Sequence, residues 1–236
     1  MAKDPRLEDT ARLAELGLIS ATLAHELRQP LFATRALAQL LQVKVTDPTQ
    51  AALVRDLLRQ SQLMESLVDG ISLASRRAGS ELVALDLRAS VQQVLDLMEH
   101  RARSASLALS FEAQQGLGAS RAEPTAVVQI VMNLVANALD ASPPGGTVHV
   151  RIEARQDLHW VLVEDQGPGI PEPLAERIFE PFFSTKPAGQ GTGLGLAVAR
   201  VLAERAGARL ELVRSGPGAR FGLAVRPWVD GSGSGD

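Results

Sequence analysis

The amino-acid sequence predicts an α+β fold: a long helical hairpin that forms a dimeric four-helix bundle, then an α/β sandwich with a mixed, mostly antiparallel sheet. Apolar residues keep a heptad spacing up to about residue 74. After about residue 80, short alternating segments separate helical ones. The 236 residues, 45% of them hydrophobic, suffice to bury two cores. We therefore expect domains at residues 1–79 and 80–229, and a flexible tail of linker composition at 230–236.

The heptad spacing runs in two stretches separated by Thr46-Asp47-Pro48-Thr49. Asp47 or Thr49 can cap a new helix there, and Pro48 is tolerated in its first turn. Two long helices joined by so short a loop make an antiparallel hairpin. Apolar residues flank each seam, more than two helices can cover, which predicts a homodimer. The seam positions are Leu13, Leu16, Ser20, Leu23, Leu27, Pro30, Thr34, Leu37 and Leu41, then Leu53, Leu57, Gln60, Met64, Leu67, Ile71 and Ala74.

A histidine and a glutamate adjoin on the first predicted helix, at His25 and Glu26. The heptad pattern turns the imidazole towards solvent, where most histidines are inert. Pro30 favours a functional interpretation, because a proline in a helix interior disrupts the helix one turn earlier and costs about 3 kcal/mol. At such a place an imidazole can accept a chemical group while the neighbouring carboxylate manages its proton.

From about residue 80 the pattern predicts a layer of helices on a mostly antiparallel sheet. The segment Arg76-Arg77-Ala78-Gly79-Ser80 ends the helical period and marks the boundary. The expected helices are 89–103, 124–141 and 194–206. The expected strands are 82–87, 107–113, 147–154, 159–164, 208–213 and 220–225.

Three motifs in this half are each weak evidence alone, since polar helix positions or a plain turn would look the same. Asn133 and Asn137 lie four apart on one helix, so their amides point the same way, and an amide oxygen suits Mg²⁺. Asp165 precedes Gly167 and Gly169 after a strand, where a carboxylate can accept a hydrogen bond from an adenine amino group. A glycine-rich run, 189–196, opens a helix whose amides can hold triphosphate oxygens. In combination they predict an ATP pocket.

The segment His25-Glu26-Leu27-Arg28-Gln29-Pro30-Leu31 resembles the phosphoacceptor box of sensor histidine kinases, which is His-Glu, three variable residues, then Pro-Leu. The three later motifs, with residues 179–186 between the last two, resemble the ATP-binding domain of these kinases, which gyrase, MutL and a heat-shock chaperone share. The resemblance covers residues 10–227 with both domains in the family's order. It implies an ATP- and Mg²⁺-dependent protein-histidine kinase of a two-component system, which phosphorylates His25 and then an aspartate of a response regulator.

The resemblance also implies a role for each matching residue. Glu26 would take a proton from His25, Asn137 would ligate Mg²⁺, and Asp165 would read adenine. Asn133 stands where ATPases of the superfamily place a glutamate, and an amide cannot activate water. A lid from about residue 180 to 192 is expected to move without ATP. The other nucleotide-binding positions are Gly167, Gly169, Phe182, Phe183, Lys186, Gly191, Thr192, Gly193, Leu194 and Gly195.

Three positions depart from the commonest pattern of the family. Gln29 replaces a Thr or Asn linked to dephosphorylation of the regulator, Asp140 replaces a basic residue, and Ala219 replaces a threonine near adenine. Two alternatives keep the fold and change the activity. One is a nucleotide-binding pseudokinase scaffold that dimerises and recruits a regulator. The other is a gyrase-like ATPase whose bundle only dimerises.

Bulk composition excludes several other classes of protein. With 24 Lys+Arg against 27 Asp+Glu and only 3% aromatic residues, the chain lacks the charge and the stacking surface expected of a nucleic-acid binder. The absence of cysteine removes disulfides and thiolate metal sites. No membrane segment or signal peptide is predicted, so we expect a cytoplasmic location. An upstream sensor domain or a partner protein would supply the signal.

Overall fold

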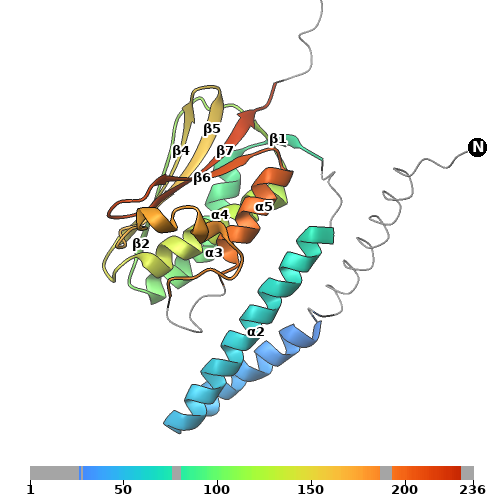
Figure 1. The fold of residues 1–236 in the computed structure, drawn as a ribbon, viewed down its shortest axis with the longest axis vertical. Coiled ribbons are helices and arrows are strands. Elements are labelled where there is room, and N and C mark those ends of the chain that lie inside the picture. Colours follow the sequence, from blue (N-terminus) through green and yellow to red (C-terminus); the bar gives the residue numbers. More distant parts are fainter. Residues whose placement is uncertain (1–26, 28, 76–80, 187–192, 230–236) are drawn as a thin grey trace, which may run out of the picture. The chain divides into compact units, whose positions relative to one another are not determined.

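The computed structural model describes residues 27, 29–75, 81–186 and 193–229. Contacts divide the chain into two units, one of residues 1–79 with 181–194 and one of residues 80–180 with 195–236. The first contains a helical hairpin and the second an α/β sandwich (Figure 1). The predicted order, a helical region followed by an α/β domain with a mixed sheet, is confirmed.

The hairpin consists of a helix through residues 29–44 and of α2 (Pro48–Ser75). The Asp47 carboxylate accepts a hydrogen bond from the Gln50 amide at 2.9 Å, so Asp47 caps α2 as predicted. The Thr34 hydroxyl donates to the Pro30 carbonyl at 2.8 Å, one turn back in the first helix. His25 and Glu26, and the predicted kink beside them, lie outside the described residues.

Among the described side chains of the hairpin, the buried positions are Ala38, Val54, Ser61 and Val68. The last three are seven apart, which is the heptad spacing. The seam leucines whose side chains are described instead remain exposed in the single chain. These leucines are Leu27, Leu37, Leu41, Leu53 and Leu57, and the seam residue Met64 is exposed as well. Among its described side chains the hairpin thus buries small and β-branched residues and leaves these leucines exposed.

The α/β unit contains a seven-stranded sheet in the order β1-β3-β7-β5-β4-β2, with β6 paired to β7. Only β2 and β4 are parallel; the other pairs are antiparallel. The prediction of a mostly antiparallel sheet is therefore confirmed. The strands are β1 (Val83–Leu85), β2 (Ala108–Ala113), β3 (Ser120–Ala122), β4 (Thr147–Arg155), β5 (Leu158–Glu164), β6 (Arg209–Arg214) and β7 (Arg220–Pro227).

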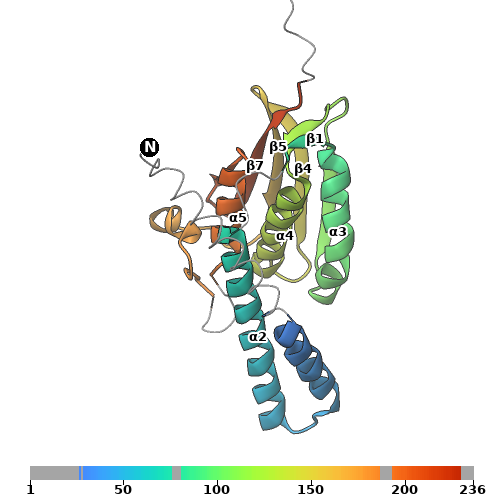
Figure 2. The same ribbon diagram turned by 90° about the vertical axis from the view of Figure 1, so that its right-hand side faces the viewer.

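Three helices cover one face of this sheet, α3 (Leu87–Ser104), α4 (Pro124–Ala141) and α5 (Gly195–Arg205) (Figure 2). The middle helix, α4, has the predicted bounds and buries an apolar face that includes Val131, Leu134 and Val135. By length and composition alone α4 would also pass as a membrane span. Its contacts with α3, α5 and β5 make it the core helix of this domain.

Three details differ from the prediction. The strand predicted at 82–87 is shorter, because Asp86 caps α3 through hydrogen bonds to the Arg88 and Ala89 amides and the helix begins at Leu87. The pattern missed β3, since three residues are too few to show an alternation. It also missed two short 3₁₀ helices, Glu172–Leu174 and Arg177–Phe179.

Candidate nucleotide site

Asp165 directly follows β5 and is 6% exposed. Its Oδ1 accepts hydrogen bonds from the Gly167 amide at 2.8 Å and the Ala219 amide at 3.1 Å. Its own amide donates to the Ala219 carbonyl at 3.0 Å. Within the described part of the chain, Oδ2 has no protein partner and is not sealed from solvent. The carboxylate is therefore oriented by backbone amides and retains one oxygen for a ligand.

Burial raises the pKa of Asp165 above its ordinary value, and the nearby negative charge of Glu164 adds to this effect. The amides of Gly167 and Ala219 and the charge of Arg214 oppose the increase. A poorly solvated carboxylate gains more from a hydrogen-bond donor than an exposed one does. An amino group of a ligand base is such a donor.

Two loops interlock around Asp165: the base loop, residues 165–170, and the β6–β7 turn, residues 215–219. The Gly218 amide donates to the Gly167 carbonyl at 2.9 Å, and the Ile170 amide donates to the Ser215 carbonyl at 2.8 Å. Gly218 has φ +72°, and a Cβ there would lie 2.4 Å from the Asp165 carbonyl oxygen. Glycine at this position lets the turn approach the Asp165 backbone so closely.

The base loop is also fixed to the C-terminal end of α4. The Gln166 amide donates to the Ser142 hydroxyl at 3.2 Å, and the Gln166 side-chain oxygen accepts from the Thr147 amide at 3.0 Å. A Cβ at Gly167 would lie 2.6 Å from the Ala141 carbonyl oxygen. Asp165 is thus held beside the helix that carries the asparagine pair.

The two asparagines lie against the N-terminus of α5. Asn133 and Asn137 are half-buried on one face of α4. A Cβ built on Gly195, the first residue of α5, would lie 3.8 Å from Asn137 Nδ2 and 3.9 Å from Asn133 Oδ1. The free amides of a helix N-terminus attract anions, and amide oxygens suit a hard cation. This end of the domain therefore combines donors for phosphate with oxygen ligands for Mg²⁺.

The segment that precedes α5 carries three of the predicted nucleotide-binding residues, Phe182, Phe183 and Lys186. The Phe182 amide donates to the Gly193 carbonyl at 2.9 Å, which joins the two ends of this segment. Phe182 is exposed, Phe183 and Lys186 are half-buried, and Leu194 directly precedes α5. Gly191, Thr192 and the rest of the glycine-rich run up to residue 192 lie outside the described residues, and the predicted lid motion stays a prediction.

Two family models match the chain. The model described as histidine kinase-, DNA gyrase B-, and HSP90-like ATPase matches residues 122–228. The model of the His Kinase A phospho-acceptor domain matches residues 15–79. The solved catalytic domain of the histidine kinase ThkA is 32% identical, with a TM-score of 0.56, over 62% of this chain and 96% of that one. The chain belongs to the histidine kinase family.

Other histidine kinases match over most of the chain. The sensor protein kinase PilS of Pseudomonas aeruginosa is 35% identical over 85% of this chain and 38% of its own length. The kinase AtoS of Escherichia coli is 29% identical over 93% of this chain and 36% of its own length. Full-length ShkA, solved in complex with AMPPNP, is 27% identical with a TM-score of 0.68 over 89% of this chain and 46% of that one. The chain therefore spans less than half the length of the curated relatives named here.

The structure shows the contacts of two residues at which this histidine kinase departs from the commonest family pattern, Asp140 and Ala219. Asp140, one turn beyond Asn137, accepts a hydrogen bond from Arg101 of α3 at 2.6 Å, which puts an ion pair where a basic residue is common. Ala219 has no side-chain hydroxyl, and its backbone amide contacts Asp165 instead. Gln29 is exposed at the start of the described helix.

The family resemblance placed Ala219 near adenine, but sequence reasoning missed the hydrogen bonds between the β6–β7 turn and the base loop, and it missed Arg214, which donates to the Gly218 carbonyl. Gly218 and Ala219 are 51 and 52 residues from Gly167, and only the pairing of β5 with β7 brings them together. His159 lies outside every motif: its side chain is buried, and its Nδ1 lies 2.8 Å from the Ser120 hydroxyl. Burial lowers the pKa of His159.

The residues present fit ATP and Mg²⁺. One end of the site offers a buried carboxylate acceptor, Asp165, and the other offers the asparagine pair at a helix N-terminus. Among the described residues no group of three acidic or histidine side chains could hold a metal by itself.

Proposed function

We propose that this chain binds ATP with Mg²⁺ in its α/β domain and transfers the γ-phosphoryl group to His25. The observation that carries the proposal is that one α/β domain holds both a carboxylate oriented by backbone amides, Asp165, and an asparagine, Asn137, beside the N-terminus of α5. The match of the phospho-acceptor domain to residues 15–79, which include His25, supports the choice of nucleophile. The ShkA complex with AMPPNP, a nucleotide, supports the choice of ligand.

The chemistry assigns a separate role to each residue. Asp165 accepts a hydrogen bond from the adenine amino group, and the amides at the start of α5 bind phosphate oxygens. Asn137 would hold Mg²⁺, which would supply positive charge to offset the charge that develops on the phosphates. A ring nitrogen of His25 forms a bond to the γ-phosphorus while the bond from that phosphorus to the bridging oxygen breaks and ADP leaves. Glu26 accepts the proton from the other ring nitrogen. Asn133 has no basic group with which to activate water, so hydrolysis is disfavoured.

The test is incorporation of ³²P from γ-labelled ATP into the full chain. The wild-type chain is expected to acquire an acid-labile, base-stable label, and His25→Gln is expected to lose it while still binding ATP. Asn137→Ala is expected to lose the label through loss of the metal. His100→Gln is the matched control, because His100 is an exposed histidine of α3 outside every motif.

Each other outcome assigns a different activity. Label that persists in His25→Gln contradicts the choice of nucleophile. ATP binding without label in the wild-type chain supports the pseudokinase scaffold. Steady release of phosphate without labelled protein supports the gyrase-like ATPase.

We further propose that the phosphohistidine donates its phosphoryl group to the aspartate of a response-regulator receiver domain. ThkA, the relative with the similar catalytic domain, has been solved in complex with the response regulator protein TrrA, and that structure is 27% identical over 93% of this chain. Purified labelled chain, mixed with candidate receivers, should lose label to the receiver that it serves. Replacing the acceptor aspartate of that receiver should stop the transfer.

We propose a homodimer as the working form of the kinase. The exposed leucines at Leu37, Leu41, Leu53 and Leu57 form an apolar face that the hairpin does not cover by itself, and two copies would bury it in a four-helix bundle. Sedimentation should give twice the chain mass for the wild-type chain and the monomer mass for Leu41→Glu/Leu53→Glu. Mixing a His25 variant with an Asn137 variant would then show whether phosphorylation crosses between copies. The signal would come from an upstream domain or a partner protein.

A further inference from the structure

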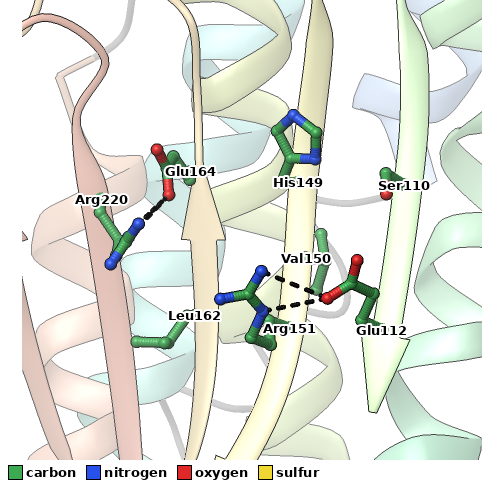
Figure 3. A pocket seen from close by; sticks show the side chains of 8 residues that line it. All are labelled: Ser110, Glu112, His149, Val150, Arg151, Leu162, Glu164 and Arg220. Carbon is green, nitrogen blue, oxygen red and sulfur yellow. Dashed lines mark hydrogen bonds and ion pairs between the residues drawn. The ribbon is translucent and has the colours of Figure 1, made fainter.

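Three charged residues form a cluster on the face of the sheet that the helices leave uncovered. Glu164 ends β5, Arg214 ends β6 and Arg220 begins β7. Arg220 donates to Glu164 Oε2 at 2.7 Å through its Nε, and Arg214 donates to Glu164 Oε1. Figure 3 shows Glu164 and Arg220 joined across the neighbouring strands. We call these three residues the Glu164 clamp.

The clamp reaches the loops that hold Asp165. Besides binding Glu164, Arg214 donates through its Nε to the Gly218 carbonyl at 3.2 Å. Gly218 is the residue of the β6–β7 turn whose backbone approaches Asp165. The next residue, Ala219, supplies the amide that orients the Asp165 carboxylate. Glu164 is itself the chain neighbour of Asp165. One arginine therefore ties the end of β5 to the turn that positions the base-reading carboxylate.

The clamp is charged in the folded protein. Burial by itself would raise the pKa of Glu164, but the hydrogen bond and the charge of Arg220, followed by those of Arg214, outweigh burial and lower it. Glu164 and Arg220 are only 23% and 24% exposed, so their pairing is better shielded from solvent than an ordinary surface pair. Two arginines on one carboxylate also leave both of its oxygens occupied.

A second ion pair on the same face provides a comparison. Arg151 of β4 binds Glu112 of β2 at 3.2 Å, and it lines the same open hollow of about 270 Å³ as Glu164 and Arg220 (Figure 3). Its side chain is 50% exposed, close to the 44% of Arg214. Among the described residues its hydrogen bond and ion pair join two strands and involve neither the base loop nor the β6–β7 turn. Arg151 and Arg214 are therefore similarly exposed and each pairs with a glutamate, but of the two only Arg214 is seen to bind the β6–β7 turn.

We infer that Arg214 and Glu164 are positioning residues for nucleotide recognition, which act through the β6–β7 turn to hold Asp165 in the orientation that selects adenine. The inference rests on the proposed function, since it requires that Asp165 reads the base. Loss of Arg214 frees the Gly218 carbonyl and leaves Glu164 with one partner, so the turn no longer fixes the Ala219 amide against Asp165. Affinity for ATP and discrimination against GTP then fall together, because guanine presents a carbonyl oxygen where adenine presents an amino donor.

The experiment measures the Kd of ATP and of GTP for the full chain by calorimetry, with the unfolding midpoint of each variant alongside. Arg214→Ala is expected to weaken ATP binding about tenfold, the effect of losing a hydrogen bond to a charged group that positions a binding residue. GTP binding should change less than about twofold, so the ATP preference falls. Arg151→Ala, the matched control, should leave both dissociation constants within about twofold of the wild-type values. Glu164→Gln keeps the size and one acceptor oxygen, and its effect should lie between these two.

The outcomes separate the inference from the proposed function. A wild-type chain that does not bind ATP overturns both. A wild-type chain that binds ATP, with Arg214→Ala binding it equally well, overturns the inference alone. Equal weakening of ATP and GTP by Arg214→Ala means that the clamp only stabilises the fold, which also overturns it. If Arg214→Ala does not fold, Glu164→Gln replaces it in the test. A lower preference for ATP over GTP in Glu164→Gln than in Arg151→Ala supports the inference, and an equal preference overturns it.

Discussion

Replacing Gly218 by alanine tests the interlocked loops directly. At φ +72° an alanine costs about 1–2 kcal/mol in backbone strain. Its Cβ would also lie 2.4 Å from the Asp165 carbonyl oxygen, a backbone atom that cannot move aside by a side-chain rotation. Forcing the loops apart adds about 1–3 kcal/mol, the usual cost of overpacking. We therefore expect Gly218→Ala to lower the free energy of unfolding by about 2–5 kcal/mol.

The matched control is Gly207→Ala. Gly207 has φ +63°, and nothing lies within 4 Å of a Cβ built there. This variant therefore carries the backbone strain without the close approach, and the difference between the two variants isolates about 1–3 kcal/mol. Both tryptophans, Trp160 and Trp228, lie in the α/β unit. Urea unfolding followed by tryptophan fluorescence thus reports this domain alone.

Nucleotide affinity provides the second measurement. Displacing the turn removes the Ala219 amide from Asp165, so Gly218→Ala should bind ATP at least tenfold more weakly, while Gly207→Ala should bind it normally. Equal losses of stability in the two variants, or normal ATP binding by Gly218→Ala, would refute the interlocking of the loops.

Two further changes test the charges of the buried groups. Asp165→Asn keeps an oxygen for the two amides but replaces Oδ2 by a donor, so the affinity for ATP should fall at least tenfold. The unfolding midpoint should not fall. An unchanged affinity for ATP, measured by calorimetry, would contradict the role assigned to Asp165. His159→Gln should flatten the pH dependence of stability, measured by urea unfolding at about pH 7.5 and 5.5. The folded pKa of His159 is lowered by burial, so the unfolded chain binds the extra proton and the wild-type protein loses stability as the pH falls below about 6.5. An equal loss in the variant would exclude His159 as the source.

Much of the α/β fold could be predicted because its elements carry local signals. The helix α4 starts where Glu123-Pro124 allows a first turn, and it ends before Pro143-Pro144-Gly145-Gly146, so its predicted and observed bounds agree. The strand β3 gives no such signal, because its three residues are held by the pairing with β1 and β7.

The candidate site likewise combines residues that local sequence motifs reveal with contacts that they do not reveal. Asp165 and the asparagine pair stand in short motifs that a reader of the sequence can recognise. The resemblance placed Ala219 near adenine, but its hydrogen bond to Asp165 could not be read from the sequence, because the two residues are 54 apart and meet only through the register of β5 on β7. Arg214 is one of many arginines in the sequence, and nothing local distinguishes it from Arg151. In the hairpin, helical spacing alone does not say which heptad positions face the chain's own second helix, such as Val54 and Val68, and which would face another copy.

The contact between Ala219 and Asp165 has a consequence for how this protein tolerates change. The donors that aim the carboxylate belong to the main chain, which every amino acid other than proline supplies equally. Substitutions of small residues at position 219 should therefore leave purine selection intact, whereas a proline there, or any shift in where the turn sits, would abolish it. In the proposed site the groups that orient the Asp165 carboxylate are therefore set by the path of the backbone and are little affected by substitution of neighbouring side chains.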